Sequence, residues 1–313
     1  MNTAPVIIFT YDRLDTLKKT IRSLENNDLA RETDCFIFSD YYDEKKNNYD
    51  KVCNVRAFLN EFSKNSVFAN VFTCFAPEHK GLSQSIIQGV TKVISRYGKA
   101  IIVEDDLVVS KSFLRYMNEA LIFFQDNPQI WSISGYSIGL ISTQNINSDI
   151  YLSRRGSSWG WATWYDRWES VDWDVKDYEY FIGNEEKTKS FNLCGEDMTD
   201  LLRMWRNKQT DSWAIRFDYA QYCKGKYTVF PKESQVINLG MNGEGSNCNK
   251  SLLNIFRTYL YELDESISFE LVSDYRKIEK EKARVYSSKI HSRLMIVYAR
   301  WYTRLLNRMK QRT

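Results

Sequence analysis

The stretch that decides the fold is KAIIVEDDLVVS, residues 99–110. Its apolar run at 100–103 is typical of a buried strand in a parallel sheet. The run ends in Glu104, Asp105 and Asp106, which cannot be buried unpaired without a large cost. Because open α/β sheets bind ligands at the carboxyl ends of their strands, we expect these acids to face a ligand. Their oxygens suit Mg²⁺ or Mn²⁺, which bind diphosphates, and the alternative is a solvated acidic turn.

The residues before this stretch alternate between strand and helix patterns. We expect strands at 5–9, 35–38 and 67–75, and helices at 14–24, 52–62 and 81–93. This alternation predicts an α/β fold, with a mostly parallel, doubly wound sheet and helices on both of its faces. The carboxyl ends of its strands, and the polar loops that follow them, would converge in one crevice.

Two of these polar loops are candidates for contact with a nucleotide. Thr10, Tyr11 and Arg13 follow the first expected strand, and Asp40 follows the second. An alternative role for Asp12, in the first loop, is to cap the next helix. The chain has no GxGxxG or GxxxxGK[ST] motif. A bound phosphate would therefore need a metal ion on the acids, helped by Arg or Lys.

The second half of the chain supplies further candidates. Its expected strands lie at 130–134, 228–231 and 234–237, and its helices at 112–126 and 198–205. Aromatic residues crowd positions 151–174, where Arg154 and a small-residue turn precede Trp159, Gly160 and Trp161. Arginine beside tryptophan is typical of a site for an anionic group or a sugar, and the alternative is a structural core.

Two acids near aromatic residues are candidates for a general base. Asp211 and Asp218 flank Trp213, and apolar surroundings can tune a carboxylate for proton transfer. The alternative for Asp211 is to cap a helix. The glycine-rich loop at 238–247 contains Asn242 and can approach a ligand closely, and its length and polarity fit a lid. The alternative is a loop with no role in binding.

The net charge of +3 hides an asymmetry along the chain. Residues 276–313 hold twelve Lys or Arg and two acids, a net charge of +10, which leaves −7 for the rest. An acidic body argues against nucleic-acid binding. The basic tail has an apolar stripe that includes Trp301, a pattern typical of a helix on an anionic membrane. The alternatives are a helix that packs on the body or that binds a partner.

Cysteine usage and hydropathy indicate a cellular setting. Six dispersed cysteines form no CxxC pair, which argues against structural zinc and favours reduced thiols in the cytoplasm. An expected strand begins within five residues of the start, so we expect no signal peptide. No apolar run approaches the length needed to span a bilayer.

The chain resembles GT-A-type glycosyltransferases, in particular family 2-like bacterial enzymes of surface-polysaccharide biosynthesis, and more distantly the N-acetylglucosaminyltransferase I type. The similar stretches, which span about residues 5–248, are PVIIFTYDRLDTLKKTIRSL, FIFSD, HKGLSQSIIQGV, IIVEDDLVVSKSFLRYM, SSWGWATW, DSWAIRFDYA and NLGMNGEGSNC. The resemblance implies a GT-A domain at 1–250, with a nucleotide-binding half at 1–110 and an acceptor and catalytic half at 111–250. Residues 251–313 would form a helical extension.

The resemblance also implies roles for individual residues. Asp106 would bind Mn²⁺ or Mg²⁺, with Asp211 as the base and Asp218 in reserve. The donor would contact Thr10, Tyr11, Arg13, Asp40, Glu104 and Asp105, and the sugar and acceptor pocket would include Arg154, Trp159, Gly160, Trp161, Trp213 and Asn242. The chain departs from similar sequences at Asn242, where they usually have Asp, and at Asn247, where they usually have His. A metal ion would then depend more on Asp106, the diphosphate and water.

The function that follows is a metal-dependent transferase of a hexosyl or N-acetylhexosaminyl group. It would move the sugar from a nucleotide-diphosphate donor to a hydroxyl of a glycan or a lipid-linked oligosaccharide, with inversion. We expect it in the cytoplasm or on the inner face of the cell membrane. One alternative is a sugar nucleotidyltransferase, although the loop at 9–14 lacks the glycines of that class. Another is a non-catalytic carbohydrate-binding protein, which would leave the acids at 104–106 unexplained.

Overall fold

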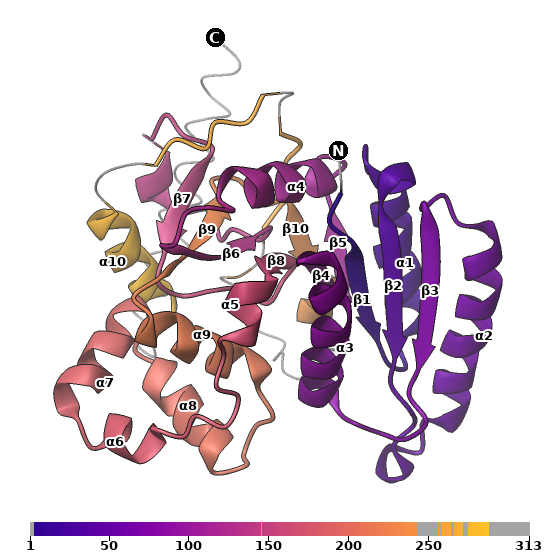
Figure 1. Cartoon of the computed structure of the whole chain (residues 1–313), viewed down its shortest axis with the longest axis horizontal. Helices are drawn as coiled ribbons and strands as arrows, with labels where there is room; N and C mark the ends of the chain where they lie inside the picture. The colour runs from indigo at the N-terminus through magenta and orange to yellow at the C-terminus, as the bar shows by residue number, and fades with distance from the viewer. Residues whose placement is uncertain are drawn as a thin grey trace.

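An eight-stranded sheet forms the centre of the computed structural model of the chain (Figure 1). The structure describes residues 3–144, 146–242, 256, 258–263, 266–271 and 275–287. The strand order is β3-β2-β1-β4-β8-β6-β9-β7. The strands are β1 (Val6–Thr10), β2 (Asp34–Ser39), β3 (Asn70–Phe75), β4 (Lys99–Glu104), β6 (Ile130–Ser134), β7 (Ile150–Ser153), β8 (Trp161–Trp164) and β9 (Tyr227–Pro231). A two-stranded antiparallel ribbon joins β5 (Leu107–Val109) to β10 (Val236–Asn238).

The first four strands of the sheet run parallel, as the sequence predicts. Thr10 lies opposite Ser39, and Phe9 lies opposite Glu104. The loops after β1, β2 and β4 therefore leave the sheet at the same edge. β7 and β8 run antiparallel to their neighbours. The sequence does not predict these two strands. Both are buried along their whole length, so they lack the alternation of polar and apolar residues that marks a half-exposed strand.

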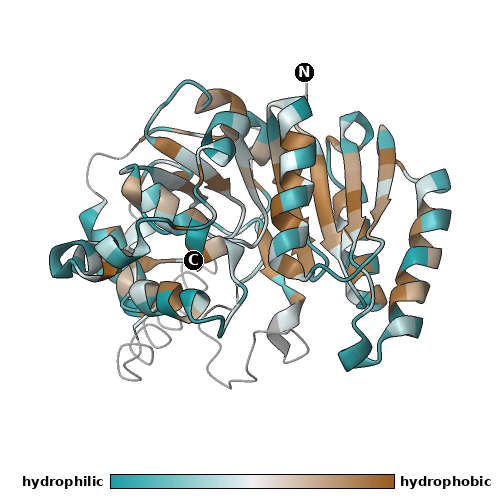
Figure 2. Ribbon diagram, turned by 60° about the horizontal axis from the view of Figure 1, so that its bottom comes forward, coloured by the Kyte–Doolittle hydropathy of each residue, from teal (hydrophilic) through white to brown (hydrophobic). Residues whose placement is uncertain are grey.

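Helices cover both faces of the sheet, which confirms the predicted fold class. α1 (Leu14–Glu25), α2 (Tyr49–Asn65) and α4 (Phe113–Phe123) share one apolar core with alternate strand residues such as Ile8. α3 (Leu82–Tyr97), α5 (Tyr165–Glu169) and α9 (Trp213–Cys223) share a second core with the opposite set, such as Ile7. Figure 2 shows the apolar strands enclosed between helices with polar outer surfaces.

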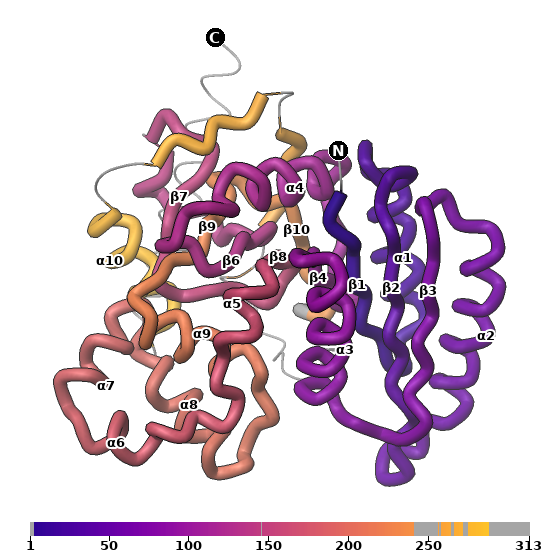
Figure 3. The backbone as a smooth tube through the Cα atoms, viewed as in Figure 1, coloured from indigo at the N-terminus to yellow at the C-terminus, as the bar shows by residue number. Residues whose placement is uncertain are grey.

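A smaller group of helices packs beside this second core. α6 (Tyr178–Ile182), α7 (Glu185–Phe191) and α8 (Met198–Arg206) enclose a third apolar cluster against α9. They form a lobe at the lower left of the backbone trace in Figure 3. The short 3-10 helices are η1 (Ala30–Glu32), η2 (Glu44–Lys46), η3 (Ile141–Thr143), η4 (Asn192–Cys194) and η5 (Leu239–Asn242).

The last described helix, α10 (Arg276–Val285), packs on the body of the protein. Its Ile278 and Val285 are buried in the first core. The carboxylate of Glu281 accepts hydrogen bonds from the backbone N–H groups of Ile141, at 2.9 Å, and Ser142, at 2.8 Å. This part of the basic tail is therefore a packed helix, one of the alternatives that the sequence left open. The apolar stripe with Trp301 lies outside the described residues.

Candidate active site at the carboxyl edge of the sheet

Asp105 organises the loop that follows β1. It is buried, and its Oδ2 accepts a hydrogen bond from Thr10 Oγ1 at 2.8 Å and one from the backbone N–H of Tyr11 at 3.2 Å. Its Oδ1 accepts a hydrogen bond from the guanidinium of Arg13. The structure thus brings together four of the expected donor-site residues, in two loops that are more than ninety positions apart in the sequence.

Asp106 is held differently from its neighbour. Its Oδ2 accepts a hydrogen bond from Arg13 Nη1 at 2.9 Å, while its Oδ1 is buried and has no hydrogen-bond partner among the described residues. The backbone N–H of Leu239 donates to its carbonyl oxygen at 2.7 Å. A Cβ built on Gly240 would lie 3.3 Å from Asp106 Cγ. The start of the glycine-rich loop therefore lies against this carboxylate, in contact that only glycine permits.

Burial and the neighbouring carboxylates raise the pKa values of Glu104 and Asp105. Burial, then Asp106 and Asp105, raise the pKa of Glu104 to about 8, against a smaller opposite effect of Arg13. Burial also raises the pKa of Asp105 to about 6, although Arg13 and the hydrogen bonds to its carboxylate lower it. Burial lowers the pKa of Arg13, but the two aspartates more than offset this and raise it. Arg13 is thus the cation that faces these acids, and its single positive charge is too small to balance all of them.

Asp40 shapes the loop that precedes α3. Its Oδ1 accepts from the backbone N–H groups of Tyr41, at 2.8 Å, and Lys80, at 3.0 Å. Its Oδ2 accepts from the N–H of Gly81 at 2.9 Å and lies 2.9 Å from His79 Nδ1. Both oxygens therefore have protein partners. The predicted contact between Asp40 and a nucleotide base stays a prediction, and the observed role is to hold this loop.

Asp211 lies beside the same loop. A Cβ built on Gly81 would be 3.6 Å from Asp211 Oδ2, and the Asp211 side chain is otherwise exposed. Arg216 fixes this arrangement, because it bonds the carbonyl of Ser212 and the hydroxyl of Ser83 at the start of α3. The alternative role of Asp211 as a helix cap is wrong, since Ser212 Oγ accepts the capping hydrogen bond from the N–H of Ile215.

Asp218, in the middle of α9, belongs to a different cluster. Its Oδ1 accepts a hydrogen bond from the N–H of Gly156 at 2.9 Å. Burial raises its pKa to about 6, although nearby Arg155 and Lys282 lower it. Arg155 itself pairs with Asp197, at 2.6 and 2.9 Å, and its guanidinium lies 3.5 Å from the centre of the Tyr286 ring. These contacts tie Asp218 to the loop before β8 and to the segment around α10.

Lys282 of α10 is buried at the centre of this cluster. Its Nζ donates to Ser153 Oγ at 2.8 Å and to the carbonyl of Arg155 at 3.2 Å. Burial lowers its pKa well below the ordinary value. Arg154, a candidate for the sugar pocket, is partly exposed, bonds the hydroxyl of Tyr227 at 3.4 Å and lies 3.5 Å from Glu279. The two arginines therefore have protein partners that the sequence did not reveal.

Of the three tryptophans expected in the sugar and acceptor pocket, two lie in the core and one lies nearer the surface. Trp161 and Trp213 are only 2% and 4% exposed, and their rings stack at 4.8 Å. They belong to the core between β8 and α9, not to the surface of a pocket. Trp159 is partly buried and meets the ring of Tyr136 edge-on at 4.5 Å. Gly160 has a φ of +64°, and a Cβ there would meet Val236 at 2.9 Å.

The alternative role of Asp12, a cap for the helix that follows it, is wrong. α1 begins without a side-chain cap, and Asp12 instead accepts a hydrogen bond from Asn48 Nδ2 at 2.7 Å. This contact joins the loop after β1 to the loop after β2.

Asn242 lies in η5, but its side chain is outside the described part of the structure. Its predicted place in the pocket therefore stays a prediction.

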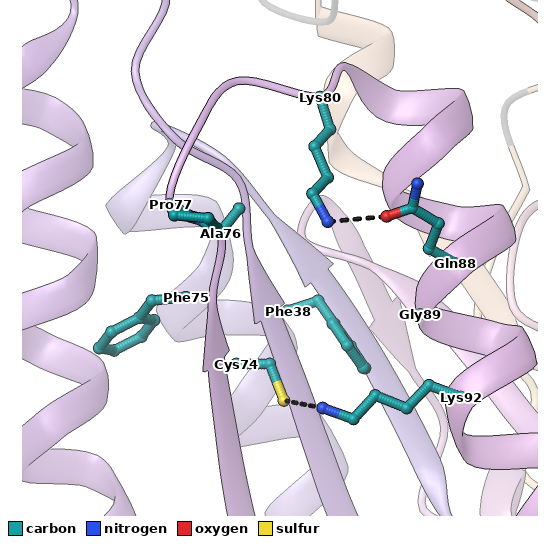
Figure 4. Close-up of a pocket in the computed structure, with 9 residues that line it drawn as sticks. All are labelled: Phe38, Cys74, Phe75, Ala76, Pro77, Lys80, Gln88, Gly89 and Lys92. Carbon is teal, nitrogen blue, oxygen red and sulfur yellow. Dashed lines mark hydrogen bonds between the residues drawn. The ribbon is translucent and has the colours of Figure 1, made fainter.

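A pocket of about 220 Å³ lies between β3, the end of β2, and α3 (Figure 4). Its lining includes Phe38, Cys74 and Gly89, and two lysines reach across it. Lys80 Nζ donates to Gln88 Oε1 at 2.7 Å, and Lys92 Nζ lies 3.8 Å from Cys74 Sγ. Because the backbone of Lys80 also holds Asp40, this pocket adjoins the loop of the candidate donor site without including the acids.

The donor set at the acids fits a hard divalent cation that a diphosphate also ligates. Mg²⁺ in such sites binds one or two carboxylates and completes its shell with phosphate oxygens and water. Within the described ranges, no group of three or more His, Cys, Asp or Glu side chains could hold a metal ion by itself. The free oxygen of Asp106 and the close approach of Gly240 are nevertheless what one protein ligand at this edge requires.

Comparisons with known proteins give distant structural likenesses only. No protein-family model matches the chain, and no curated protein sequence matches it. Among solved structures it is similar to S. aureus TarS, with 13% identity over 40% of this chain and 20% of that chain and a TM-score of 0.30. It is also similar to residues 1–349 of TarS, with 8% identity over 77% of this chain and 61% of that one and a TM-score of 0.41.

A third similar structure is the mannosyltransferase PcManGT from Pyrobaculum calidifontis in complex with GDP-Man and Mn²⁺. The identity is 8% over 71% of this chain and 69% of that chain, and the TM-score is 0.38. The chain thus spans about a fifth of the longer TarS chain and 61% of the shorter one. At these scores the likenesses carry no argument about the residues of the site. Among the described residues, no helix has the length and hydropathy to cross a bilayer.

Proposed function

We propose that this protein is a glycosyltransferase with a GT-A fold, which uses a nucleotide-diphosphate sugar and a divalent cation. The observation that carries the proposal is the free, buried Oδ1 of Asp106 at the carboxyl edge of the sheet. A buried acceptor without a donor is costly, and a bound cation would satisfy it. Arg13, Thr10 and Tyr11 would line the donor beside this cation, which accounts for the convergence of their loops on Asp105.

Mn²⁺ or Mg²⁺ held by Asp106 would neutralise the charge that develops on the leaving diphosphate. Asp211 would accept the proton of the acceptor hydroxyl, whose oxygen bonds to the anomeric carbon. The bond from that carbon to the diphosphate oxygen breaks, and its electron pair leaves with the diphosphate. Attack from the face opposite the leaving group inverts the configuration. The exposure of Asp211 and its position beside Gly81, in the loop that precedes α3, favour it over Asp218, whose carboxylate accepts a hydrogen bond from Gly156.

The finer parts of the proposal concern the sugar, the acceptor and the location. The transferred group is a hexosyl or N-acetylhexosaminyl group, and the acceptor is a glycan, free or lipid-linked, of polysaccharide biosynthesis. Trp159 and Arg154 would lie on the acceptor side. The protein would work in the cytoplasm or at the inner face of the membrane. α10 packs on the body through Ile278, Lys282 and Val285 and leaves Lys277, Lys280 and Arg284 exposed, and we keep contact of the basic tail, 276–313, with an anionic membrane as part of the proposal.

Release of nucleoside diphosphate from a panel of nucleotide sugars, with and without Mn²⁺, tests the proposal. We expect metal-dependent release with one class of donor. Asp106→Ala should abolish it, and Asp211→Asn should reduce turnover by at least about 100-fold with little effect on donor binding. Asp126→Asn, at an exposed position after α4, is the matched control. Full activity of Asp106→Ala would contradict the metal role, and loss of turnover only in Asp218→Asn would reassign the base.

A further inference from the structure

Asn238 lies at the end of β10, next to the candidate metal ligand. Its partner in the ribbon is Leu107, the residue after Asp106. The N–H of Leu239, the next residue, donates to the carbonyl of Asp106 at 2.7 Å. Two successive backbone pairings of this ribbon therefore fix the position of Asn238 relative to Asp106, although 131 residues separate them in the sequence.

The Oδ1 of Asn238 is buried and, like Asp106 Oδ1, has no hydrogen-bond partner in the described part of the chain. A Cβ built on Gly240 would lie 3.0 Å from Asn238 Oδ1 and 3.3 Å from Asp106 Cγ. The Asp106 carboxylate and the Asn238 amide therefore lie side by side at Gly240. The carboxylate oxygen nearest Gly240 is Oδ2, which Arg13 bonds, and the unpartnered Oδ1 belongs to the same group. The two unsatisfied acceptors of these adjacent side chains cannot satisfy each other, because neither supplies a proton. A cation satisfies both.

We infer that Asn238 is a second protein ligand of the divalent cation, through its amide oxygen. This inference rests on the proposed function and adds a ligand to it. Side-chain carbonyl and carboxylate oxygens are suitable ligands for Mn²⁺ and Mg²⁺. Arg13 engages only Oδ2 of Asp106 and does not bond Asn238. Arg13 therefore leaves one oxygen of Asp106 and one oxygen of Asn238 for the metal ion. Diphosphate and water would complete the coordination shell of the metal.

Direct measurement of Mn²⁺ binding tests this inference without relying on activity. Water-proton relaxation reports Mn²⁺ bound to the full-length protein, with Mn²⁺ alone and with GDP or UDP added. We expect Asn238→Ala to weaken binding at least about tenfold. Asn238→Asp, which keeps an oxygen at the same position, should bind at least as tightly as the wild type. Asn60→Ala, at an exposed position of α2, is the control.

The possible results separate this inference from the proposed function. If Asn238→Ala binds Mn²⁺ like the wild type while Asp106→Ala does not bind it, the inference is overturned and the proposed function stands. If the aspartate variant folds but binds as weakly as the alanine variant, the oxygen of Asn238 is not a ligand. If the wild type does not bind Mn²⁺ with either nucleotide, both the inference and the metal-dependent function are overturned.

Discussion

The guanidinium of Arg13 donates a hydrogen bond to Asp106 Oδ2 at 2.9 Å, and the other oxygen of this carboxylate has no hydrogen-bond partner in the part of the chain that the structure describes. The same guanidinium also bonds Asp105, so one side chain compensates two buried acids. Arg13 thereby compensates both acids without engaging Asp106 Oδ1, the oxygen at which we propose that a cation binds.

Replacement of Arg13 by methionine should destabilise the protein in the absence of metal. The change leaves Asp105 and Asp106 without their counter-ion, and loss of one partner of a buried pair costs about 3 kcal/mol in the free energy of unfolding. Added Mn²⁺ should restore part of the loss because it binds only the folded state. Urea unfolding with and without Mn²⁺ measures both effects. Arg22→Met, on the exposed side of α1, is the control, and equal midpoints for the two variants would contradict the account.

Gly240→Ala should damage the site more than the fold. A Cβ there would approach Asp106 Cγ to 3.3 Å and would overlap its Oδ2, so the carboxylate must move. A displacement of about 1 Å at a catalytic group can cost about 100-fold in rate. We expect this loss in the metal-dependent release of nucleoside diphosphate, with little change in melting temperature. Gly183→Ala, at a glycine with a φ of −76°, is the control. Normal release by Gly240→Ala would contradict the predicted crowding.

Lys282→Ala should show that α10 is part of the body. The variant loses two hydrogen bonds and creates a cavity beside Phe230, whose ring centre lies 3.3 Å from Lys282 Nζ. Truncation of a long, buried side chain costs about 3 kcal/mol in the free energy of unfolding. Lys280→Ala, exposed on the same helix, should change it by less than about 0.5 kcal/mol. Equal urea midpoints for the two variants would mean that α10 contributes little to stability.

The raised pKa of Asp218 predicts a pH dependence of stability. Its pKa is about 6 in the folded protein against an ordinary value of 3.8, so the folded state binds the proton more tightly. The contribution of Asp218 to stability is therefore greatest below about pH 4 and falls as the pH rises to about 6. Arg155 and Lys282 oppose this shift, and Asp197 adds to it.

Asp218→Asn tests this dependence because it keeps the acceptor for Gly156 and removes the titration. The difference in unfolding free energy between the variant and the wild type should change between pH 4 and 6 and level off above pH 7. A constant difference across this range would mean that Asp218 has an ordinary pKa in the folded protein.

The parallel half of the sheet could be predicted from sequence because its signals are local. The apolar runs that became β1, β2 and β4 each end in polar residues, and these residues meet at one edge as expected. β8 escaped prediction because the aromatic residues of 161–164 are buried on both faces. Their pattern therefore resembles a binding surface as much as a core strand.

Other features depend on contacts between distant segments. Lys282 belongs to a strongly basic helix, where a solvent-exposed lysine is the usual expectation, yet Ser153 and Arg155 provide it with buried partners. Ser212, not Asp211, caps α9, and adjacent capping candidates are hard to distinguish by sequence. The one available signal for Asn238 was its position, a polar residue between a short strand and the glycine-rich loop.

The most direct test of the central claim is thermal melting of the wild type and Asp106→Ala against a panel of nucleotide sugars, each with and without Mn²⁺. A ligand that binds only the folded state raises the melting temperature by mass action. We predict a metal-dependent rise with one donor class in the wild type and none in the variant. An equal rise in both proteins, or a rise that does not require Mn²⁺, would contradict a metal-dependent donor site at Asp106.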